Sequence, residues 1–155
     1  MSAITPAIAG DEAEVPPISP ADGSDVAVLG LGPMTSMAWE LARRLERDGY
    51  SAAVINPRFI KPLDREMIET YARRVAAFVT FEDHVKMGGF GSAVLEALEE
   101  IGSKVPVIRI GWPDQFIEHG KIDDLRARHG VTVDEAQAQL TPLLTRRQRR
   151  ALVAS

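Results

Sequence analysis

Four short apolar runs alternate with segments that have the periodicity of helices, and this alternation restricts the fold more than any other feature. The runs are 26–29, 52–55, 76–81 and 105–110. Short continuous apolar runs are typical of parallel strands that are buried on both faces. Parallel strands need crossover connections, which helices supply. We therefore predict a three-layer α/β/α domain with a mostly parallel sheet of four to five strands.

The segments between the runs contain signals for the ends of helices. Asp64 is a good N-cap, and Thr132 together with Glu135 has the spacing of a capping box. Gly49 and Gly130 are placed to end helices. The predicted helices span 34–47, 65–73, 92–101, 121–129 and 132–150.

The first 24 residues differ in composition from the rest of the chain. They contain four prolines and four acids, with no lysine or arginine. Such a segment buries little apolar surface, and prolines lack the N–H donor that a strand needs. We predict a proline-rich acidic tail or linker over 1–24, in which 15–18 could form a short edge strand. One domain over 25–150 follows.

Composition excludes several classes of protein. The chain has no cysteine, so it contains neither disulfides nor cysteine nucleophiles. Its net charge of −4 argues against general nucleic-acid binding. No apolar run approaches the roughly 20 residues of a membrane span, and the N-terminus lacks a signal-peptide pattern. We expect a cytoplasmic protein that binds neither nucleic acid nor membranes. The arginine-rich segment 146–150 could contact nucleic acid or acidic lipid, but a solvated helix end explains it more simply.

The stretch 78–92 concentrates the residues that could carry chemistry or recognition. Its strand runs into Glu82, Asp83 and His84, and a glycine cluster and the start of a helix follow. In open α/β sheets, ligands and partner surfaces meet the fold at the carboxyl ends of strands. Glycines there allow another backbone to approach closely, and free N–H groups at a helix start attract anions.

Two interpretations of Glu82, Asp83 and His84 remain open. They could form an acid/base group, because histidine ordinarily titrates near neutral pH. No serine or second histidine is placed to complete a triad, however. We favour the second interpretation, in which these residues cap backbone groups or contact a partner chain.

Other candidate motifs have simpler structural explanations. The Gly30-Leu31-Gly32 turn resembles the start of a dinucleotide fingerprint, but the position of the third glycine is Thr35. The second strand also ends at Asn56, where an acid would be needed, so we predict only a tight turn. His119 and His129 lack the spacing of metal ligands, and we expect no metal site.

The segment 111–120 is rich in aromatic and apolar residues. Trp112, Phe116 and Ile117 could form an exposed apolar patch, or they could cover the edge of the sheet. Because we expect these residues to lie in a loop, we predict the patch.

Four motifs in order identify a family resemblance. They are Gly32-Pro33-Met34 at a helix start, Asn-Pro-Arg-Phe-Ile-Lys-Pro-Leu-Asp at 56–64, Glu-Asp-His-Val-Lys-Met-Gly-Gly-Phe-Gly-Ser at 82–92, and Ile-Gly-Trp-Pro-Asp-Gln-Phe-Ile-Glu-His-Gly at 110–120. With these motifs, residues 25–144 resemble the C-terminal domain of the 1-deoxy-D-xylulose-5-phosphate synthases, a branch of the transketolase family. The resemblance implies the fold of a transketolase C-terminal domain.

The resemblance also implies an activity for the whole enzyme. Such synthases are transferases that condense pyruvate with glyceraldehyde 3-phosphate, with loss of carbon dioxide, for isoprenoid and thiamine biosynthesis. They use thiamine diphosphate and magnesium, which two upstream domains bind. This chain has no Gly-Asp-Gly metal motif followed by an asparagine. We therefore expect no catalytic, cofactor-binding or metal residue here, and no catalysis by this chain alone.

The resemblance further implies a role in assembly. The expected partners are the upstream thiamine-binding domains or a separate subunit that carries them, within a homodimer. The predicted interface residues are Glu82, Asp83, His84, Gly88, Gly89, Gly91, Ser92, Trp112 and Phe116. The alternative is a stand-alone binding or regulatory module that has kept the fold without the catalytic context.

Overall fold

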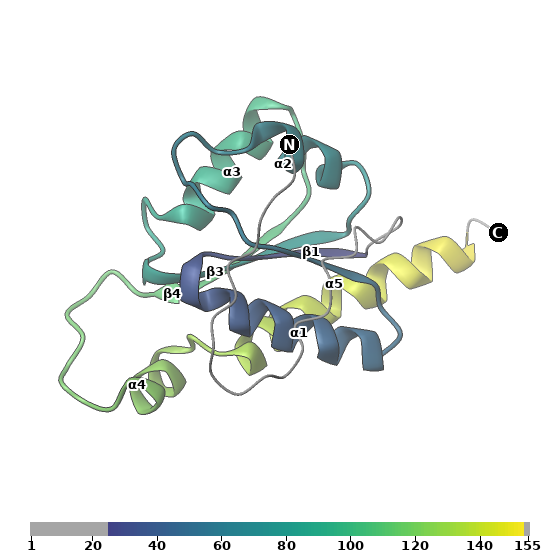
Figure 1. The fold of residues 1–155 in the computed structure, drawn as a ribbon. Helices are drawn as coiled ribbons and strands as arrows, with labels where there is room; N and C mark the ends of the chain where they lie inside the picture. The colour runs from purple at the N-terminus through teal and green to yellow at the C-terminus, as the bar shows by residue number, and fades with distance from the viewer. Residues whose placement is uncertain (1–24, 154–155) are drawn as a thin grey trace, which may run out of the picture.

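The sheet has four parallel strands in the order β2-β1-β3-β4. The computed structural model of the chain describes the backbone of residues 25–153 and the side chains of residues 25–145. The strands are β1 (Val26–Gly30), β2 (Ala52–Ile55), β3 (Ala77–Val85) and β4 (Val107–Trp112). Helices cover both faces (Figure 1), so the predicted three-layer fold is confirmed. The tail or linker predicted over 1–24 lies outside the described residues.

The helices follow the strands in the predicted order. They are α1 (Thr35–Arg47), preceded by the 3-10 turn η1 (Gly32–Met34), then α2 (Arg65–Ala72), α3 (Phe90–Glu100), α4 (Ile122–His129) and α5 (Val133–Val153). Asp64 and Thr132 are confirmed as N-caps, because Asp64 Oδ1 accepts a hydrogen bond from Met67 N at 2.9 Å and Thr132 Oγ1 accepts one from Glu135 N at 3.2 Å. Among the residues that the structure describes, no helix combines the length and apolar character that a bilayer crossing needs.

The strand β1 lies at the centre of two separate cores. Val26 and Val28 pack with α1 and α5, whereas Ala27 and Leu29 pack with α2 and α3. Both faces of the strand are therefore buried, which explains why its sequence is a continuous apolar run. Complete burial of each large apolar side chain of this kind stabilises the fold by about 1.5–3 kcal/mol.

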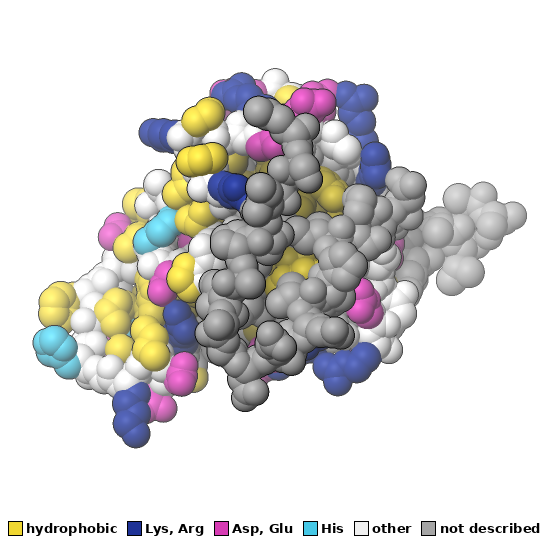
Figure 2. All heavy atoms as spheres, in the orientation of Figure 1, with side chains coloured by type: hydrophobic (Ala, Val, Ile, Leu, Met, Phe, Trp, Pro, Cys, Tyr) yellow, Lys and Arg dark blue, Asp and Glu magenta, His cyan; other side chains and the backbone are white. Residues whose placement is uncertain are grey.

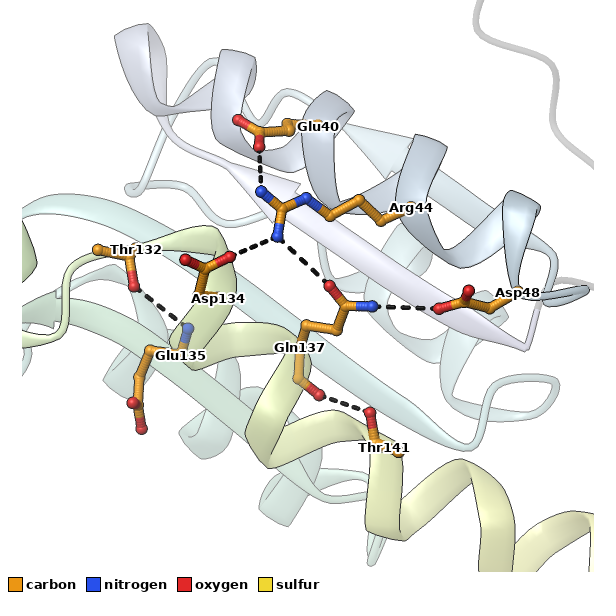
Figure 3. A network of polar contacts seen from close by, with 8 residues as sticks. All are labelled: Glu40, Arg44, Asp48, Thr132, Asp134, Glu135, Gln137 and Thr141. Atoms are coloured by element: carbon orange, nitrogen blue, oxygen red, sulfur yellow. Dashed lines mark hydrogen bonds and ion pairs between the residues drawn. The ribbon is translucent and has the colours of Figure 1, made fainter.

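A polar network joins α5 to α1 beside the first core (Figure 3). Arg44 of α1 donates hydrogen bonds of 2.5 Å to both Glu40 and Asp134. Gln137 of α5 donates one of 3.1 Å to Asp48. Hydrogen bonds with the two carboxylates raise the pKa of Arg44, so its guanidinium stays charged. The network fixes the position of the first turns of α5 along α1.

Two strands extend further toward the carboxyl edge than the sequence predicts. β3 does not end at Phe81, because Val85 pairs with Trp112 of β4 after an irregularity in register. Strand β4 accordingly runs two residues past the predicted end at position 110. Polar residues at 82–84 resemble a loop in the sequence, but they belong to β3 in the structure. The next helix, α3, begins at Phe90 instead of Ser92, for a reason that involves Glu82.

Candidate functional site

Glu82 of β3 caps the helix α3. Its side chain is 0% exposed, with Oε2 accepting a hydrogen bond from Phe90 N at 2.6 Å and Oε1 accepting one from Gly91 N at 3.0 Å. The first N–H groups of a helix have no partner within the helix, and a carboxylate can satisfy them. The capping role favoured for this acid is therefore present, with the cap coming from a strand instead of the adjacent N-cap residue.

Glycines enclose this carboxylate. A Cβ atom at Gly89 would overlap Glu82 Oε2 and lie 2.5 Å from Val85 O, and one at Gly111 would lie 2.8 Å from Glu82 Cγ. Gly89 has an ordinary φ of −86°, so it is required for space and not for backbone conformation. The space beside Gly89 is therefore filled by this chain's own atoms, and a role for Gly89 in an interface stays a prediction.

Two further glycines of the cluster have different roles. Gly88 has a φ of 68°, a left-handed conformation that favours glycine. Gly91 is buried, and a Cβ atom there would lie 2.7 Å from Thr80 Oγ1 and 2.8 Å from Arg109 Cδ. Gly91 therefore contacts this chain's interior and not its surface.

His84 contacts the same carboxylate from its solvent side. Its Nδ1 atom lies 2.8 Å from Glu82 Oε2, and its side chain is 41% exposed. Burial raises the pKa of Glu82, while the amides of Gly91 and Phe90 and the charges of His84 and Arg109 act in the opposite direction. A buried carboxylate that orients an exposed imidazole is a feature of some acid/base sites. Here the same carboxylate also holds a helix.

Arg109 completes the support for the loop between β3 and α3. Its Nη1 atom donates to Lys86 O at 3.2 Å and to Ser92 Oγ at 3.0 Å. Ser92 Oγ itself donates to Lys86 O at 2.8 Å. One loop carbonyl is thus held from a strand and from a helix. Sequence reasoning missed Arg109, although an arginine inside an otherwise apolar run was a usable signal.

Asp83 points away from Glu82 and belongs to a second cluster. It accepts hydrogen bonds from Trp112 Nε1 at 2.9 Å and from Arg126 Nη2 at 3.3 Å. The rings of Trp112 and His129 meet edge to face, with centroids 5.9 Å apart. Glu82 and Asp83 therefore belong to different clusters, because successive side chains of a strand point to opposite faces.

The predicted apolar patch of Trp112, Phe116 and Ile117 is wrong for two of its three members. Trp112 is 9% exposed because it ends β4 and its indole N–H has a carboxylate partner. Ile117 packs against the core, and only Phe116, at 89%, projects into solvent.

The remaining candidate residues do not form a recognisable catalytic or metal site. His129 Nε2 lies 3.3 Å from Glu118 Oε2, and within residues 25–145 no group of three or more acids or histidines is arranged to hold a metal ion. The Gly30-Leu31-Gly32 turn is closed by Thr35 Oγ1, whose single hydroxyl proton faces two carbonyl oxygens, Gly30 O at 2.8 Å and Gly32 O at 2.7 Å. This geometry is a tight turn between a strand and a helix.

Known proteins are similar to this chain in sequence and in fold. The sequence model described as "Transketolase, C-terminal domain" matches residues 18–135. A curated 1-deoxy-D-xylulose-5-phosphate synthase of Acidobacterium capsulatum is 59% identical over 125 residues, which are 81% of this chain and 20% of that protein. The synthase of Methylacidiphilum infernorum is 55% identical over 122 residues, which are 79% of this chain and 19% of that protein. The chain thus spans about a fifth of the length of these relatives.

A solved structure also matches the fold. It is described as a split gene transketolase, inactive beta4 tetramer, and it aligns with a TM-score of 0.72 at 38% sequence identity. The alignment covers 80% of this chain and 40% of that chain. The resemblance identified from the four sequence motifs is confirmed by these matches, and this chain belongs to the transketolase C-terminal domain family.

Proposed function

We propose that the chain is the C-terminal domain of a 1-deoxy-D-xylulose-5-phosphate synthase, the thiamine-diphosphate-dependent transferase that condenses pyruvate with glyceraldehyde 3-phosphate. The observation that carries this proposal is 59% identity to a curated synthase over 125 residues. The names of the relatives do not favour a stand-alone binding or regulatory module. The whole enzyme would be a cytoplasmic homodimer.

The domain's own contribution would be assembly. The two carboxylates at the end of β3 do not fit magnesium with thiamine diphosphate, because both already accept hydrogen bonds within the domain. Glu82 accepts from two backbone amides, and Asp83 accepts from Trp112 and Arg126. We therefore assign the cofactor to polypeptide outside this chain, and we assign to this chain the role of a rigid platform for that polypeptide.

A chimeric enzyme tests the proposal. Residues 25–145 would replace the matched segment of the Acidobacterium capsulatum synthase, and formation of 1-deoxy-D-xylulose 5-phosphate would be measured. We expect turnover within tenfold of the parent enzyme, whereas the parent truncated before this segment should be inactive. A folded chimera that binds thiamine diphosphate but shows no turnover would contradict the proposed function.

The isolated chain provides a second measurement. It should show no synthase activity and no heat of binding when titrated with thiamine diphosphate and magnesium. Binding at micromolar concentration would show that the chain carries a cofactor site of its own, and the assignment of the cofactor to other domains would then be wrong.

A further inference from the structure

The segment 113–120, which we call the strap, connects β4 to α4. In Figure 1 it forms the wide loop at the left, and hydrophobic side chains are visible on that part of the surface in Figure 2. Within the described residues, its backbone–backbone hydrogen bond joins Gln115 N to Pro113 O at 2.9 Å, so both atoms belong to the strap itself. Because this bond does not reach the rest of the domain, side-chain contacts determine where the strap lies.

Two side chains of the strap converge on one histidine of α4. His129 Nδ1 lies 3.4 Å from Gln115 Nε2, and His129 Nε2 lies 3.3 Å from Glu118 Oε2. Between these two strap residues, Ile117 packs against the core. Both ring nitrogens of His129 therefore have partners in the strap, on either side of the residue that anchors the strap to the core.

The ring of His129 is itself held by the body of the domain. It meets the ring of Trp112 edge to face, with centroids 5.9 Å apart. Trp112 in turn donates its indole N–H to Asp83 at 2.9 Å. The His129 side chain is only 11% exposed, so the imidazole is enclosed by its neighbours. The ring is therefore placed to hold the strap.

The charges around this ring favour a positive charge on it. The contacts bring together two guanidiniums and three carboxylates, namely Arg126, Arg128, Asp83, Glu118 and Glu135. Arg128 of α4 pairs with Glu118, and Arg126 pairs with Asp83 at 3.3 Å. Glu135 of α5 supplies the third carboxylate, because a Cβ atom at Gly130 would lie 3.6 Å from its Cγ. An imidazolium at position 129 would balance this remaining negative charge.

We propose that His129 is a pH-dependent latch that holds the strap against α4. Imidazoles ordinarily gain a proton as the pH falls from 8 to 5. Hydrogen bonds from its own backbone N–H, from Arg128 and from His129 lower the pKa of Glu118, so its carboxylate stays charged over this range. A proton on His129 therefore converts its contact with Glu118 into a charge-assisted hydrogen bond, which is stronger. The strap is held more firmly as the pH falls through this range.

The contact between His129 and Gln115 survives the change. A neutral ring accepts a hydrogen bond at Nδ1 from the amide nitrogen, whereas a protonated ring donates there and the amide oxygen accepts after a half-turn. The contact with Glu118 therefore sets the sign of the pH effect. Phe116, which is 89% exposed, lies between the two strap contacts, so the latch controls how firmly this aromatic side chain is held in position.

Cleavage of the full chain by chymotrypsin after Phe116 tests the latch. The rate would be measured at pH 6 and pH 8, and at each pH it would be divided by the rate for a synthetic peptide of residues 110–122. Cleavage requires local opening of the strap, so this ratio follows the open population. A partly exposed ion pair changes such a population by a small factor, and we expect the ratio to be about two- to fivefold lower at pH 6. An equal ratio at both pH values, or a lower one at pH 8, would overturn the proposal.

Matched variants identify the group that titrates. His129→Gln should abolish the pH dependence of the cleavage ratio, whereas His119→Gln, at an exposed histidine of the same strap, should leave it intact. Glu118→Gln changes a half-exposed side chain and should also abolish the pH dependence, which keeps the test decisive if His129→Gln folds poorly. A pH dependence that persists in Glu118→Gln or in a folded His129→Gln protein, or that disappears in His119→Gln, would show that His129 is not the latch.

Discussion

Glu82 Oε2 lies 2.6 Å from the backbone nitrogen of Phe90, so a strand residue caps a helix that begins eight positions later in the chain. This contact joins the end of β3 to the start of α3 inside the interior of the domain. It also positions His84 and the loop that presents Met87. The stability of this edge of the sheet therefore depends on one buried carboxylate.

Replacement of that carboxylate should destabilise the whole domain. Glu82→Ala leaves the amides of Phe90 and Gly91 without acceptors in a buried position. Hydrogen bonds to charged groups contribute about 1.5–3 kcal/mol each, and part of this contribution offsets the cost of burying the charge. We therefore expect the free energy of unfolding to fall by about 2–4 kcal/mol. Urea unfolding measures this loss. The partly exposed Asp83→Ala is the comparison, and an equal loss in both variants would show that the cap has no special importance.

The pH dependence of stability should report the raised pKa of Glu82. In the unfolded chain this carboxyl loses its proton near its ordinary pKa of about 4.5, whereas burial delays the loss in the folded state. The folded state therefore binds more protons above that pH, and wild-type stability should fall relative to Glu82→Gln as the pH rises through this window. Unfolding of both proteins from pH 4 to 8 gives the difference. A difference that grows in favour of the wild type with rising pH would mean that the amides outweigh burial.

Alanine substitutions at three glycines should show which glycine is required because its surroundings leave no room for a side chain, and which are required because their backbone has a positive φ. Gly88 and Gly102 both have a φ of 68°, and a Cβ atom at either meets nothing within 4 Å, so Ala there should cost about 1–2 kcal/mol through backbone strain alone. Gly89→Ala should cost roughly 1–3 kcal/mol through overpacking against Glu82, without backbone strain. Thermal unfolding of the three variants provides the comparison. Equal losses at all three positions would contradict the packing role of Gly89.

His84→Ala distinguishes the two sequence interpretations of the histidine. If it only contacts Glu82 from the solvent side, the substitution should cost about 0.5–1.5 kcal/mol of stability and leave turnover of the chimeric synthase nearly unchanged. An assembled chimera that loses its turnover with this substitution would revive the acid/base interpretation.

The ion pair between Arg44 of α1 and Asp134 of α5 should contribute little to the free energy of unfolding, although its atoms lie only 2.5 Å apart. Arg44 is 27% exposed and Asp134 83% exposed, and solvent screens such pairs strongly. A double-mutant cycle of Arg44→Ala and Asp134→Ala should give a coupling of about 0.2–1 kcal/mol that decreases at high salt. A coupling well above that range would mean that the network in Figure 3 acts as one unit.

The parallel sheet and the starts of the helices with an adjacent cap could be predicted from the sequence, because these features follow from local patterns. Val26 to Leu29 is apolar because both faces of β1 are covered, and Asp64 and Thr132 cap helices that begin beside them in the chain. The strand extension to Val85 was not predictable in this way. It depends on pairing with Trp112, which is distant in sequence.

The candidate site was predicted in part for the same reason. The acids and glycines of the sequence indicate that the site lies at 82–92 and that an acid caps backbone groups there. They do not indicate that Glu82 caps α3. Which of Glu82 and Asp83 points inward depends on strand alternation, and the sequence had suggested a loop there. Arg109 and Gly111 join the site only through the packing of β4 on β3.

The glycines around Glu82 make several positions of the chain mutually dependent during evolution. Gly89 and Gly111 tolerate no Cβ atom while the glutamate side chain occupies the space between them. A small residue at position 82 would relax this constraint at Gly111, where the nearest atom to an added Cβ is Glu82 Cγ, but not at Gly89, where Val85 O would still lie 2.5 Å away. Positions 82 and 111 therefore depend on each other during evolution, whereas position 89 stays restricted to glycine by the backbone, and a designer who transplants α3 with its cap into another scaffold must transfer all three residues.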